Sequence, residues 1–271
     1  MTILVTGATA NIGRMVVDQL IARGATDIRA LTINPSKAAL PAGVQVAKGH
    51  LGRPDSLPAA FAGVDRMYLA PSPDNVTEVL ELARAAGVRH VVDLSGEPES
   101  WWGSVCNAVE ASGLAWTHLW PADFMENTLT WSQQIRETDA VREPHPDSAS
   151  APIAMNDIAA VAATALLTDG HLGRAHSLGG PEILSRADMV AHLADALGRD
   201  ITFRTSTREE TIAALEPTMG DNTTWYVDNV LIDFTPPPES LPITSVEDIT
   251  GHPATTFNHW AHANAARFLT P

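Results

Sequence analysis

The sequence contains few of the residues on which several common structures and mechanisms depend. Its 271 residues include one cysteine, two tyrosines and two lysines, Lys37 and Lys48. The single cysteine, Cys106, excludes an internal disulfide, and from it we expect no cysteine-based zinc site. No stretch approaches the ~18 uninterrupted apolar residues that a bilayer-spanning helix needs. A mechanism that requires a lysine must use one of the two present.

The charge balance narrows the choice of partners. Acidic residues outnumber basic ones by 32 to 17, which gives a net charge of −15. Such a surface repels phosphate backbones and anionic lipids, so we expect neither nucleic acid nor a membrane as a partner. The chain begins with a strand-like run at residues 2–7, without a basic segment or a small-residue cleavage site. We therefore expect a cytoplasmic protein.

The first half of the chain alternates short β-branched runs with helical patterns. Strands are expected at residues 3–6, 28–32, 44–47, 67–69, 91–94 and 116–119, and helices at 13–23, 76–86 and 103–112. The runs are almost continuously apolar, as in strands that are covered on both faces. This alternation predicts an α/β fold with a doubly wound parallel sheet of the Rossmann type.

The second half is less regular. Residues 139–152 form a polar segment broken by prolines and are expected as a loop, and 235–242 as an extended surface connection. Helices are expected at about 156–167, 186–197 and 256–268, and strands at about 175–178 and 201–204. We predict a Rossmann core made of residues 1–132 and about 151–180. A smaller substrate lobe then comprises about 133–150 and 181–271.

The turn after the first expected strand is the most informative segment. Gly7-Ala8-Thr9-Ala10-Asn11-Ile12-Gly13 follows that strand and opens a helix. In this context backbone N–H groups and the helix N-terminus bind a pyrophosphate. Gly7 permits the tight turn and Gly13 permits close packing of the helix, whereas Ala10 stands where a glycine is usual. The alternative is an ordinary strand–helix turn, and the context favours dinucleotide binding.

The run at residues 6–14 (TGATANIGR) is one of several segments that share a resemblance. The others lie at residues 34–38, 91–95, 111–117, 124–127, 156–159, 179–182 and 256–261. Together they resemble the NmrA-like, atypical short-chain dehydrogenase/reductase family over nearly the whole chain. That family includes NAD(P)H-dependent quinone oxidoreductases and redox-sensing regulators. The resemblance implies a Rossmann fold that binds NADP or NAD.

Four positions depart from the family pattern around the expected cofactor. Ala10 replaces the middle glycine, and Ile33 stands where an arginine usually meets the 2′-phosphate of NADP. His50 stands at an aspartate position near the adenine, and Trp120 at an arginine position. Lys37 is either a point charge for a 2′-phosphate or a solvated lysine. The expected cofactor contacts are Gly7, Thr9, Ala10, Asn11, Ile12, Gly13, Thr32, Ile33, Lys37, His50, Leu51, Ala70, Pro71, Ser95 and Pro121.

The proton donor of ordinary short-chain dehydrogenases is missing. Those enzymes use a Tyr-x-x-x-Lys pair, but Tyr68 and Tyr226 are followed four residues later by Ser72 and Val230. A reductase here must draw its proton from water, from the substrate, or from a Ser, His, Asp or Glu side chain. Ser95, at the end of the fifth expected strand, is the candidate catalytic residue. The alternative for Ser95 is a cap of the local turn.

Large apolar side chains follow the fifth and sixth expected strands. They suit a flat aromatic or polycyclic ligand, although about half of them are expected in the core. We expect Trp101 or Trp102 on a lid over the site. The candidate substrate contacts are Ser72, Trp101, Trp102, Trp120, Phe124, Met125 and Trp131.

The ten histidines show no metal-binding spacing, so no metal site is expected. His259 and His262 could share a helix face, but no third ligand accompanies them. His118 is expected as a core residue, and Cys106 as a small buried residue on the helix at 103–112.

The sequence is compatible with three functions. The first is an NAD(P)H-dependent reductase of a quinone or an aromatic carbonyl compound. The second is a non-catalytic NAD(P) sensor, and the third is a tailoring enzyme that acts on a polycyclic substrate with little or no cofactor use. The assembly is left open, with a homodimer among the alternatives.

Overall fold

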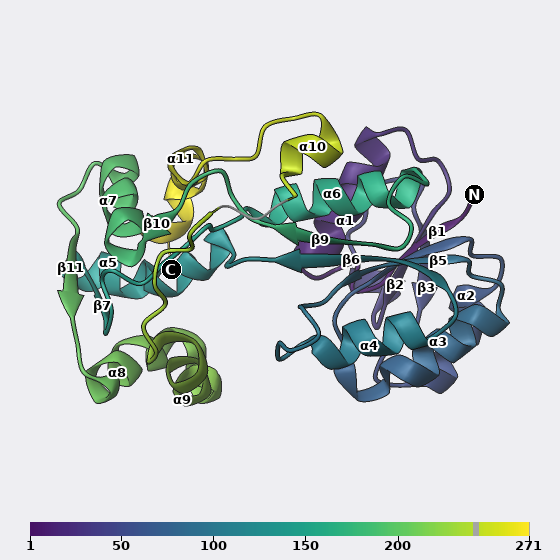
Figure 1. The fold of residues 1–271 in the computed structure, drawn as a ribbon, viewed down its shortest axis with the longest axis horizontal. Helices are drawn as coiled ribbons and strands as arrows, with labels where there is room; N and C mark the ends of the chain where they lie inside the picture. Colours follow the sequence, from purple (N-terminus) through teal and green to yellow (C-terminus); the bar gives the residue numbers. More distant parts are fainter. Residues whose placement is uncertain (241–243, 271) are drawn as a thin grey trace. The chain divides into compact units, whose positions relative to one another are not determined.

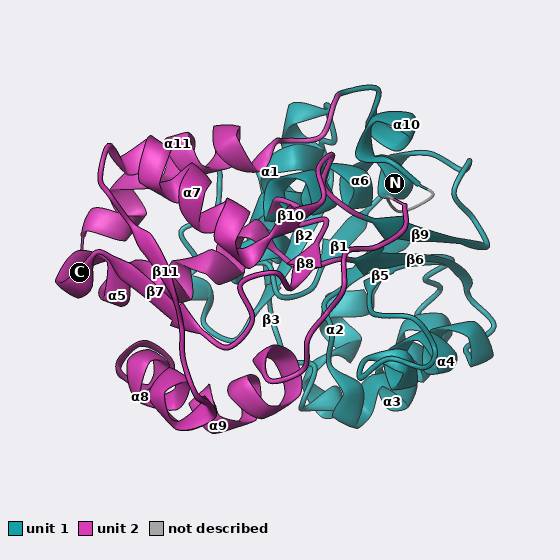
Figure 2. Ribbon diagram, turned by 60° about the vertical axis from the view of Figure 1, so that its left-hand side comes forward, with its two compact units in different colours: residues 1–121, 155–178, 243–252 teal, residues 122–154, 179–242, 253–271 magenta. Residues whose placement is uncertain are grey.

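A computed structural model describes residues 1–240 and 244–270 of the chain. It divides into two compact units (Figure 2). Unit 1 comprises Met1–Pro121, Met155–Leu178 and Ile243–His252, and unit 2 comprises Ala122–Ala154, Gly179–Pro242 and Pro253–Pro271.

These boundaries differ from the expected ones. Residues 122–132, 151–154 and 179–180, predicted in the Rossmann core, lie in unit 2, and residues 244–252 lie in unit 1. The change of unit after Pro121 has a physical reason. The sixth strand ends there, and the next segment places Met125 and Trp131 in the hydrophobic core of unit 2.

Unit 1 is built on a seven-stranded sheet with the order β3-β2-β1-β4-β5-β6-β9. All neighbouring strands in it are parallel. This is the doubly wound arrangement predicted from the alternating pattern, so the predicted fold class is confirmed. The strands are β1 (Ile3–Val5), β2 (Ile28–Thr32), β3 (Gln45–Lys48), β4 (Arg66–Leu69), β5 (His90–Leu94), β6 (Ala115–Pro121) and β9 (Arg174–Leu178).

Helices cover both faces of this sheet (Figure 1). One face carries α1 (Asn11–Ala22), α6 (Met155–Leu167) and α10 (Val246–Thr250), and the other carries α2 (Pro58–Phe61), α3 (Val76–Ala85) and α4 (Gly103–Ala111). Ten of the 13 residues of α6 are buried, most of them alanine or β-branched, so this helix packs closely against α1 and the sheet. Three 3₁₀ turns, η1 (Pro35–Lys37), η2 (Pro54–Ser56) and η3 (Pro73–Asn75), follow β2, β3 and β4.

Unit 2 is mainly helical. Its α-helices are α5 (Ser132–Thr138), α7 (Arg186–Leu197), α8 (Arg208–Met219), α9 (Thr223–Tyr226) and α11 (Phe257–Leu269). Two 3₁₀ segments, η4 (Met125–Trp131) and η5 (Gly220–Asn222), and a π-helix, η6 (Val227–Leu231), complete the helical part. Ser185, Thr207 and Thr256 cap α7, α8 and α11 through their side-chain oxygens, which accept backbone hydrogen bonds three residues later.

The segment at residues 139–152 is not simply a loop, and this expectation is corrected. It contains β7 (Ala140–Glu143), which pairs in parallel with β11 (Thr202–Thr205), and β8 (Ala149–Ser150), which pairs with β10 (Leu184–Ser185). Both partners lie tens of residues further along the chain, so local sequence patterns do not reveal the pairings. Residues 235–240 contain no helix or strand, as expected, while 241 and 242 lie outside the described residues.

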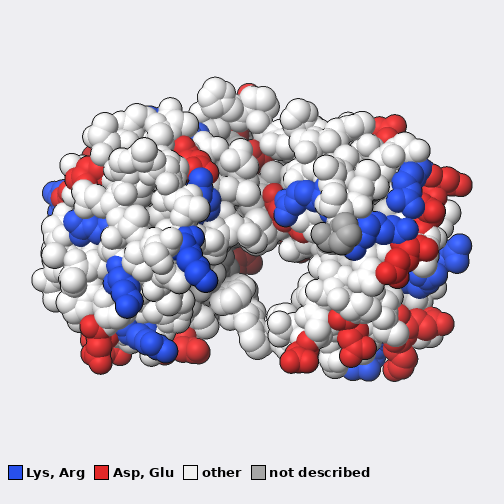
Figure 3. All heavy atoms as spheres, turned by 180° about the vertical axis from the view of Figure 1, so that it is seen from behind, with Lys and Arg blue, Asp and Glu red and all other residues white. Residues whose placement is uncertain are grey.

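Among the described residues, no helix is long and apolar enough to cross a membrane. On the face drawn in Figure 3, acidic and basic side chains are interspersed among larger uncharged areas.

Candidate functional site

The turn between β1 and α1 has the geometry of a phosphate-binding loop. Gly7 has φ +59°, in the left-handed region that L side chains rarely adopt. A Cβ on Gly13 would lie 2.2 Å from the carbonyl oxygen of Gly7, so α1 approaches the turn closely only with glycine there. Ala10 has φ −89° and ψ 172°, which any residue adopts, and it is exposed. The alanine in place of the middle glycine therefore causes no backbone strain.

The positively polarised N-terminus of α1 is neither capped by a side chain nor neutralised by an acidic residue of its first turn. Ala10, the N-cap, makes no side-chain cap hydrogen bond, and the first turn of this fully described helix contains no acidic residue. Thr9, Ala10 and Asn11 are all exposed, whereas Ile12 packs in the core. An uncapped helix N-terminus attracts anions, and this turn therefore fits the pyrophosphate of a dinucleotide.

The end of β2 carries the residues expected near the adenosine. Thr32 is buried, and its Oγ1 accepts a hydrogen bond from the Asn34 N–H at 3.3 Å. Ile33 is 63% exposed, and Lys37 is exposed in the turn that follows. The structure thus leaves Lys37 available for a phosphate, while Ile33 offers only an apolar surface.

Arg14 is a candidate that the sequence analysis missed. It lies in the first turn of α1, and its guanidinium donates a hydrogen bond to the carbonyl oxygen of Ala39 at 2.7 Å. Asp18 lies 3.2 Å from the same guanidinium. The guanidinium is therefore held beside the segment that follows β2. No pattern in the sequence indicates this contact, because the two residues are 25 positions apart and meet only in the folded chain.

The ends of β3 and β4 position the next predicted residues. His50 is exposed, and its Nδ1 accepts a hydrogen bond from the Gly52 N–H at 3.1 Å, whereas Leu51 packs in the core of unit 1. After β4, Ala70 donates its N–H to Thr6 Oγ1 at 2.8 Å, which ties the ends of β1 and β4 together. Pro71 and Ser72 follow, both half-buried.

Two buried polar atoms without partners lie at the carboxyl ends of β5 and β6. Ser95 is only 5% exposed, and its backbone N–H donates to the Leu119 carbonyl at 3.2 Å. Its Oγ and the Nε1 of Trp120 find no hydrogen-bond partner among the described residues. Most buried polar atoms in proteins are paired, so an unpaired one calls for an explanation, such as a water molecule, an ion or a ligand. Pro121 ends β6 directly beyond them.

A second polar cluster lies between the sheet and α4. Asp93 and His118 are register partners in β5 and β6, and Oδ2 of Asp93 lies 2.6 Å from Nδ1 of His118. Cys106 and Glu110, one turn apart on α4, reach toward Nε2 of the same histidine. The structure confirms that His118 and Cys106 are buried. The expectation of no metal site stays a prediction, and spacing along the chain did not show that these three side chains converge.

The large apolar residues divide between the two units. In unit 1, Trp101 and Trp102 are 70% and 38% exposed just before α4, and Trp120 is half-buried. In unit 2, Phe124 is half-buried, while Met125 and Trp131 are each 1% exposed within the core. Met125 and Trp131 are thus covered by protein, and their assignment to the substrate pocket stays a prediction that this burial does not support.

Trp131 belongs instead to a buried charged group in unit 2. Its Nε1 donates to Glu143 Oε1 at 2.6 Å, and Nε of Arg186 lies 3.7 Å from Glu143 Oε2. Burial raises the pKa of Glu143, although the positive charge of Arg186 opposes that shift. These contacts satisfy the indole N–H and explain why this tryptophan is a structural residue.

The parallel sheet, its strand order and the Gly-rich turn define unit 1 as a dinucleotide-binding Rossmann unit. Residues 7–97 match a protein-family profile described as NAD(P)H-binding. The chain is 36% identical over 283 residues to the NAD(P)H azoreductase of Xenophilus azovorans, covering 98% of this chain and 99% of that protein. It is 33% identical to the (4-alkanoyl-5-oxo-2,5-dihydrofuran-3-yl)methyl phosphate reductase of Streptomyces griseus, with the same coverage.

A solved structure supports the same assignment. The NADPH-dependent quinone oxidoreductase QOR2 of Escherichia coli superposes with a TM-score of 0.80 at 25% identity, covering 97% of this chain and 99% of that one. The chain belongs to the NmrA-like, atypical short-chain dehydrogenase/reductase family and contains an NAD(P)H-binding domain.

Proposed function

We propose that this protein is an NAD(P)H-dependent reductase of conjugated, electron-poor acceptors, with quinones and aromatic azo compounds as the leading classes. The observation that carries the proposal is the pair of unpartnered donors, Ser95 Oγ and Trp120 Nε1, at the strand ends of a dinucleotide-binding sheet. The relatives add support, because their names specify an azo compound, a quinone and an acylated dihydrofuranone. All three are conjugated acceptors.

The residues of the Gly-rich turn would hold the pyrophosphate. Gly7, Ala10 and Gly13 shape that turn, and the uncapped N-terminus of α1 provides its positive end. Arg14 and Lys37 are the cationic groups we assign to a 2′-phosphate, which makes NADPH the preferred cofactor and NADH the second choice. When bound, the dinucleotide supplies the hydride.

The chain itself stabilises the negative charge that hydride addition creates. Ser95 and Trp120 can each donate one hydrogen bond to the acceptor atom that becomes anionic. Neither tyrosine is a ready acid, since burial raises the pKa of Tyr68 above its usual range and that of Tyr226 to about 12. With a quinone as acceptor, the hydroquinone anion is only weakly basic, so water can supply the proton and no tyrosine–lysine pair is needed.

A second candidate function is a non-catalytic NAD(P) sensor. The exposed Ile33 at the usual arginine position favours it, because a sensor must release its nucleotide when the cellular ratio changes. The two candidates differ in one observable property. A sensor binds NADPH without consuming it, whereas a reductase consumes it in proportion to the acceptor.

The test is a titration followed by turnover. Binding of NADPH and NADH is measured by calorimetry, and consumption is then measured under anaerobic conditions with a panel of quinones and aromatic azo dyes. We expect saturable binding with NADPH preferred, and stoichiometric reduction of at least one class. Binding without turnover across the panel would support the sensor, and no binding at millimolar nucleotide would refute both.

A further inference from the structure

We propose that Cys106, Glu110 and His118 form a binding site for a divalent transition-metal ion of the zinc type. This proposal does not depend on the proposed reductase function, although the imidazole of His118 stacks on the indole of Trp120 with ring centroids 5.9 Å apart. All three side chains belong to unit 1, with two on α4 and one on β6. Their ligand atoms lie within 4.8 Å of one another. Thiolate, imidazole and carboxylate are the three ligand types that proteins offer to zinc.

The distances fit one ion shared by the three groups. Sγ of Cys106 and Oε1 of Glu110 each lie 3.6 Å from Nε2 of His118. Bonds of about 2.3 Å to sulfur and 2.0–2.1 Å to nitrogen or oxygen, at tetrahedral angles, place such ligand atoms about 3.3–3.6 Å apart. Small side-chain movements therefore suffice to close the site, and a fourth position is left for water.

The histidine is oriented for this role by its partner on the neighbouring strand. The carboxylate of Asp93 accepts the hydrogen bond from Nδ1–H of His118, which directs the lone pair of Nε2 toward Cys106 and Glu110. A carboxylate behind a metal-binding histidine is the usual outer-shell arrangement in zinc proteins. The indole of Trp116 stacks on the imidazole with ring centroids 4.2 Å apart and restricts its rotation.

An independent observation indicates that a cation belongs here. Asp93 is completely buried, and its Oδ1 has no hydrogen-bond partner among the described residues. A buried carboxylate is costly when only one of its oxygens is satisfied. A divalent ion that replaces the thiol proton of Cys106 adds one net positive charge beside His118, and this charge offsets the buried Asp93 carboxylate through the imidazole.

Access favours a metal ion over an organic substrate. Cys106 and His118 are fully buried, which excludes a nucleophilic role for the thiol toward a bulky molecule. The side chain of Glu110 is 48% exposed and connects the site to solvent. An ion binds through this carboxylate, and the thiol proton leaves to solvent as the sulfur–metal bond forms. The ion then bridges α4 and β6.

The single cysteine makes the test specific. Untagged protein is treated with a chelator, dialysed and titrated with Co²⁺, a spectroscopic substitute for Zn²⁺. We expect one equivalent to produce a thiolate-to-cobalt charge-transfer absorption, together with visible bands of four-coordinate intensity, and Zn²⁺ to abolish both. The absorption must come from Cys106, because the chain contains no other thiol.

Three variants complete the experiment. Cys106→Ser should lose the charge-transfer absorption, and Glu110→Gln should weaken Co²⁺ binding at least tenfold without unfolding, because Glu110 is a surface residue. Glu81→Gln, an exposed glutamate on α3, should bind as wild type. Absence of the absorption in wild-type protein with a native circular dichroism spectrum would overturn the proposal. So would unchanged affinity in Glu110→Gln.

Discussion

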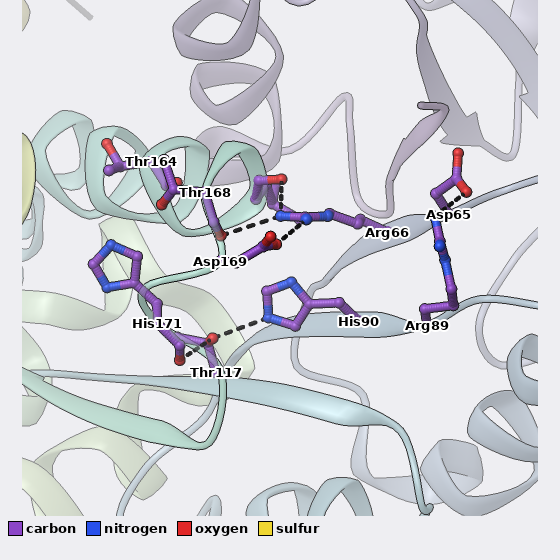
Figure 4. Close-up of polar contacts among 10 residues, drawn as sticks. Asp65, Arg66, Arg89, His90, Thr117, Thr164, Thr168, Asp169 and His171 are labelled. Atoms are coloured by element: carbon purple, nitrogen blue, oxygen red, sulfur yellow. Dashed lines mark hydrogen bonds and ion pairs between the residues drawn. The ribbon is translucent and has the colours of Figure 1, made fainter.

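The two ends of the strands in unit 1 differ in how their polar groups are satisfied. At the amino ends, Arg66 donates to the carbonyl oxygens of Leu166 and Thr168 at 3.0 and 3.1 Å and forms an ion pair with Asp169 (Figure 4). At the carboxyl ends of β5 and β6, Ser95 Oγ and Trp120 Nε1 have no partner among the described residues. The first end is tied to the chain around it by hydrogen bonds, whereas the second leaves two buried donors without partners in the described part of the chain.

The histidine at the amino end of β5 belongs to the same paired group. His90 Nε2 lies 3.0 Å from Thr117 Oγ1, which donates to the His171 carbonyl at 2.7 Å (Figure 4). Only the other ring nitrogen, Nδ1, lacks a partner among the described residues. Substitutions at the amino ends of the strands should therefore change the stability of the fold, whereas substitutions at the carboxyl ends should change cofactor binding or turnover.

The largest effect is expected in the Gly-rich turn. Gly13→Ala places a methyl group 2.2 Å from the Gly7 carbonyl, so the turn must open. We expect a loss of NADPH affinity of more than 100-fold, with destabilisation of about 1–3 kcal/mol, measured by calorimetry and urea unfolding. Gly170→Ala is the matched control, because a Cβ there meets nothing within 4 Å. Normal NADPH binding by Gly13→Ala would contradict the assigned phosphate loop.

At the opposite end of the strands, Arg66→Met should change stability alone. The variant keeps the aliphatic part of the side chain but loses the hydrogen bonds to Leu166 and Thr168. We expect a lower free energy of unfolding by about 2–3 kcal/mol with unchanged NADPH affinity. Arg89→Met, which removes the exposed ion pair with Asp65, should cost less than about 1 kcal/mol. A large change in NADPH affinity with Arg66→Met would break the comparison.

Low pH should lower the free energy of unfolding through His90, at the amino end of β5. Burial, with a contribution from the charge of Arg66, lowers the pKa of His90 to about 4. The unfolded chain binds a proton near its ordinary pKa of about 6.5, so the stabilisation is complete above that pH and is lost as the pH falls toward 4. Urea unfolding at pH 7 and 4.5 should show a loss on the order of 2 kcal/mol from this group. His90→Gln should reduce the pH dependence, and an unchanged slope would contradict the assignment.

Ser95→Ala tests the carboxyl end directly. The hydroxyl has no partner among the described residues, so its removal should alter the free energy of unfolding by less than about 0.5 kcal/mol. The proposed role in stabilising the anion predicts a kcat about tenfold lower at unchanged NADPH affinity. Ser104→Ala, on the exposed side of α4, should leave both quantities unchanged. Equal kcat in wild type and Ser95→Ala would remove this residue from the mechanism.

The smallest effect is expected at the adenosine end. Lys37→Ala should weaken NADPH binding about three- to tenfold and leave NADH binding unchanged, because only NADPH carries the 2′-phosphate. Lys48→Ala, which changes the other lysine of the chain, is the control and should alter neither affinity. The ratio of the two dissociation constants is the measurement. An equal loss for both nucleotides would refute phosphate recognition by Lys37.

The Rossmann unit was predictable because its signals are local. Apolar strand runs, glycines after helices and the Gly-rich turn each occupy a few consecutive residues, and they led to the correct fold class. The β7–β11 and β8–β10 pairings were missed because the two strands of each pair are distant in sequence. β7 and β8 were also not expected as strands, since residues 139–152 show no alternating apolar pattern.

In the candidate site, the sequence predicted only those residues whose role follows from the shape of a short stretch of backbone. The turn at Gly7 and Gly13 is of that kind, whereas Arg14 and Ala39 meet only through the fold. Asp93 and His118 illustrate the same limit. A charged residue within an apolar strand was a visible signal, but its register partner was not.

The division of unit 1 into three chain segments has a consequence for biosynthesis. When residues 1–121 leave the ribosome, they carry six of the seven strands but lack α6, whose residues 155–167 cover α1. That nascent fragment exposes the apolar side of α1 until a further 46 residues have been translated. A fragment that ends at residue 121 therefore leaves this apolar surface uncovered, and only a longer chain supplies the helix that covers it.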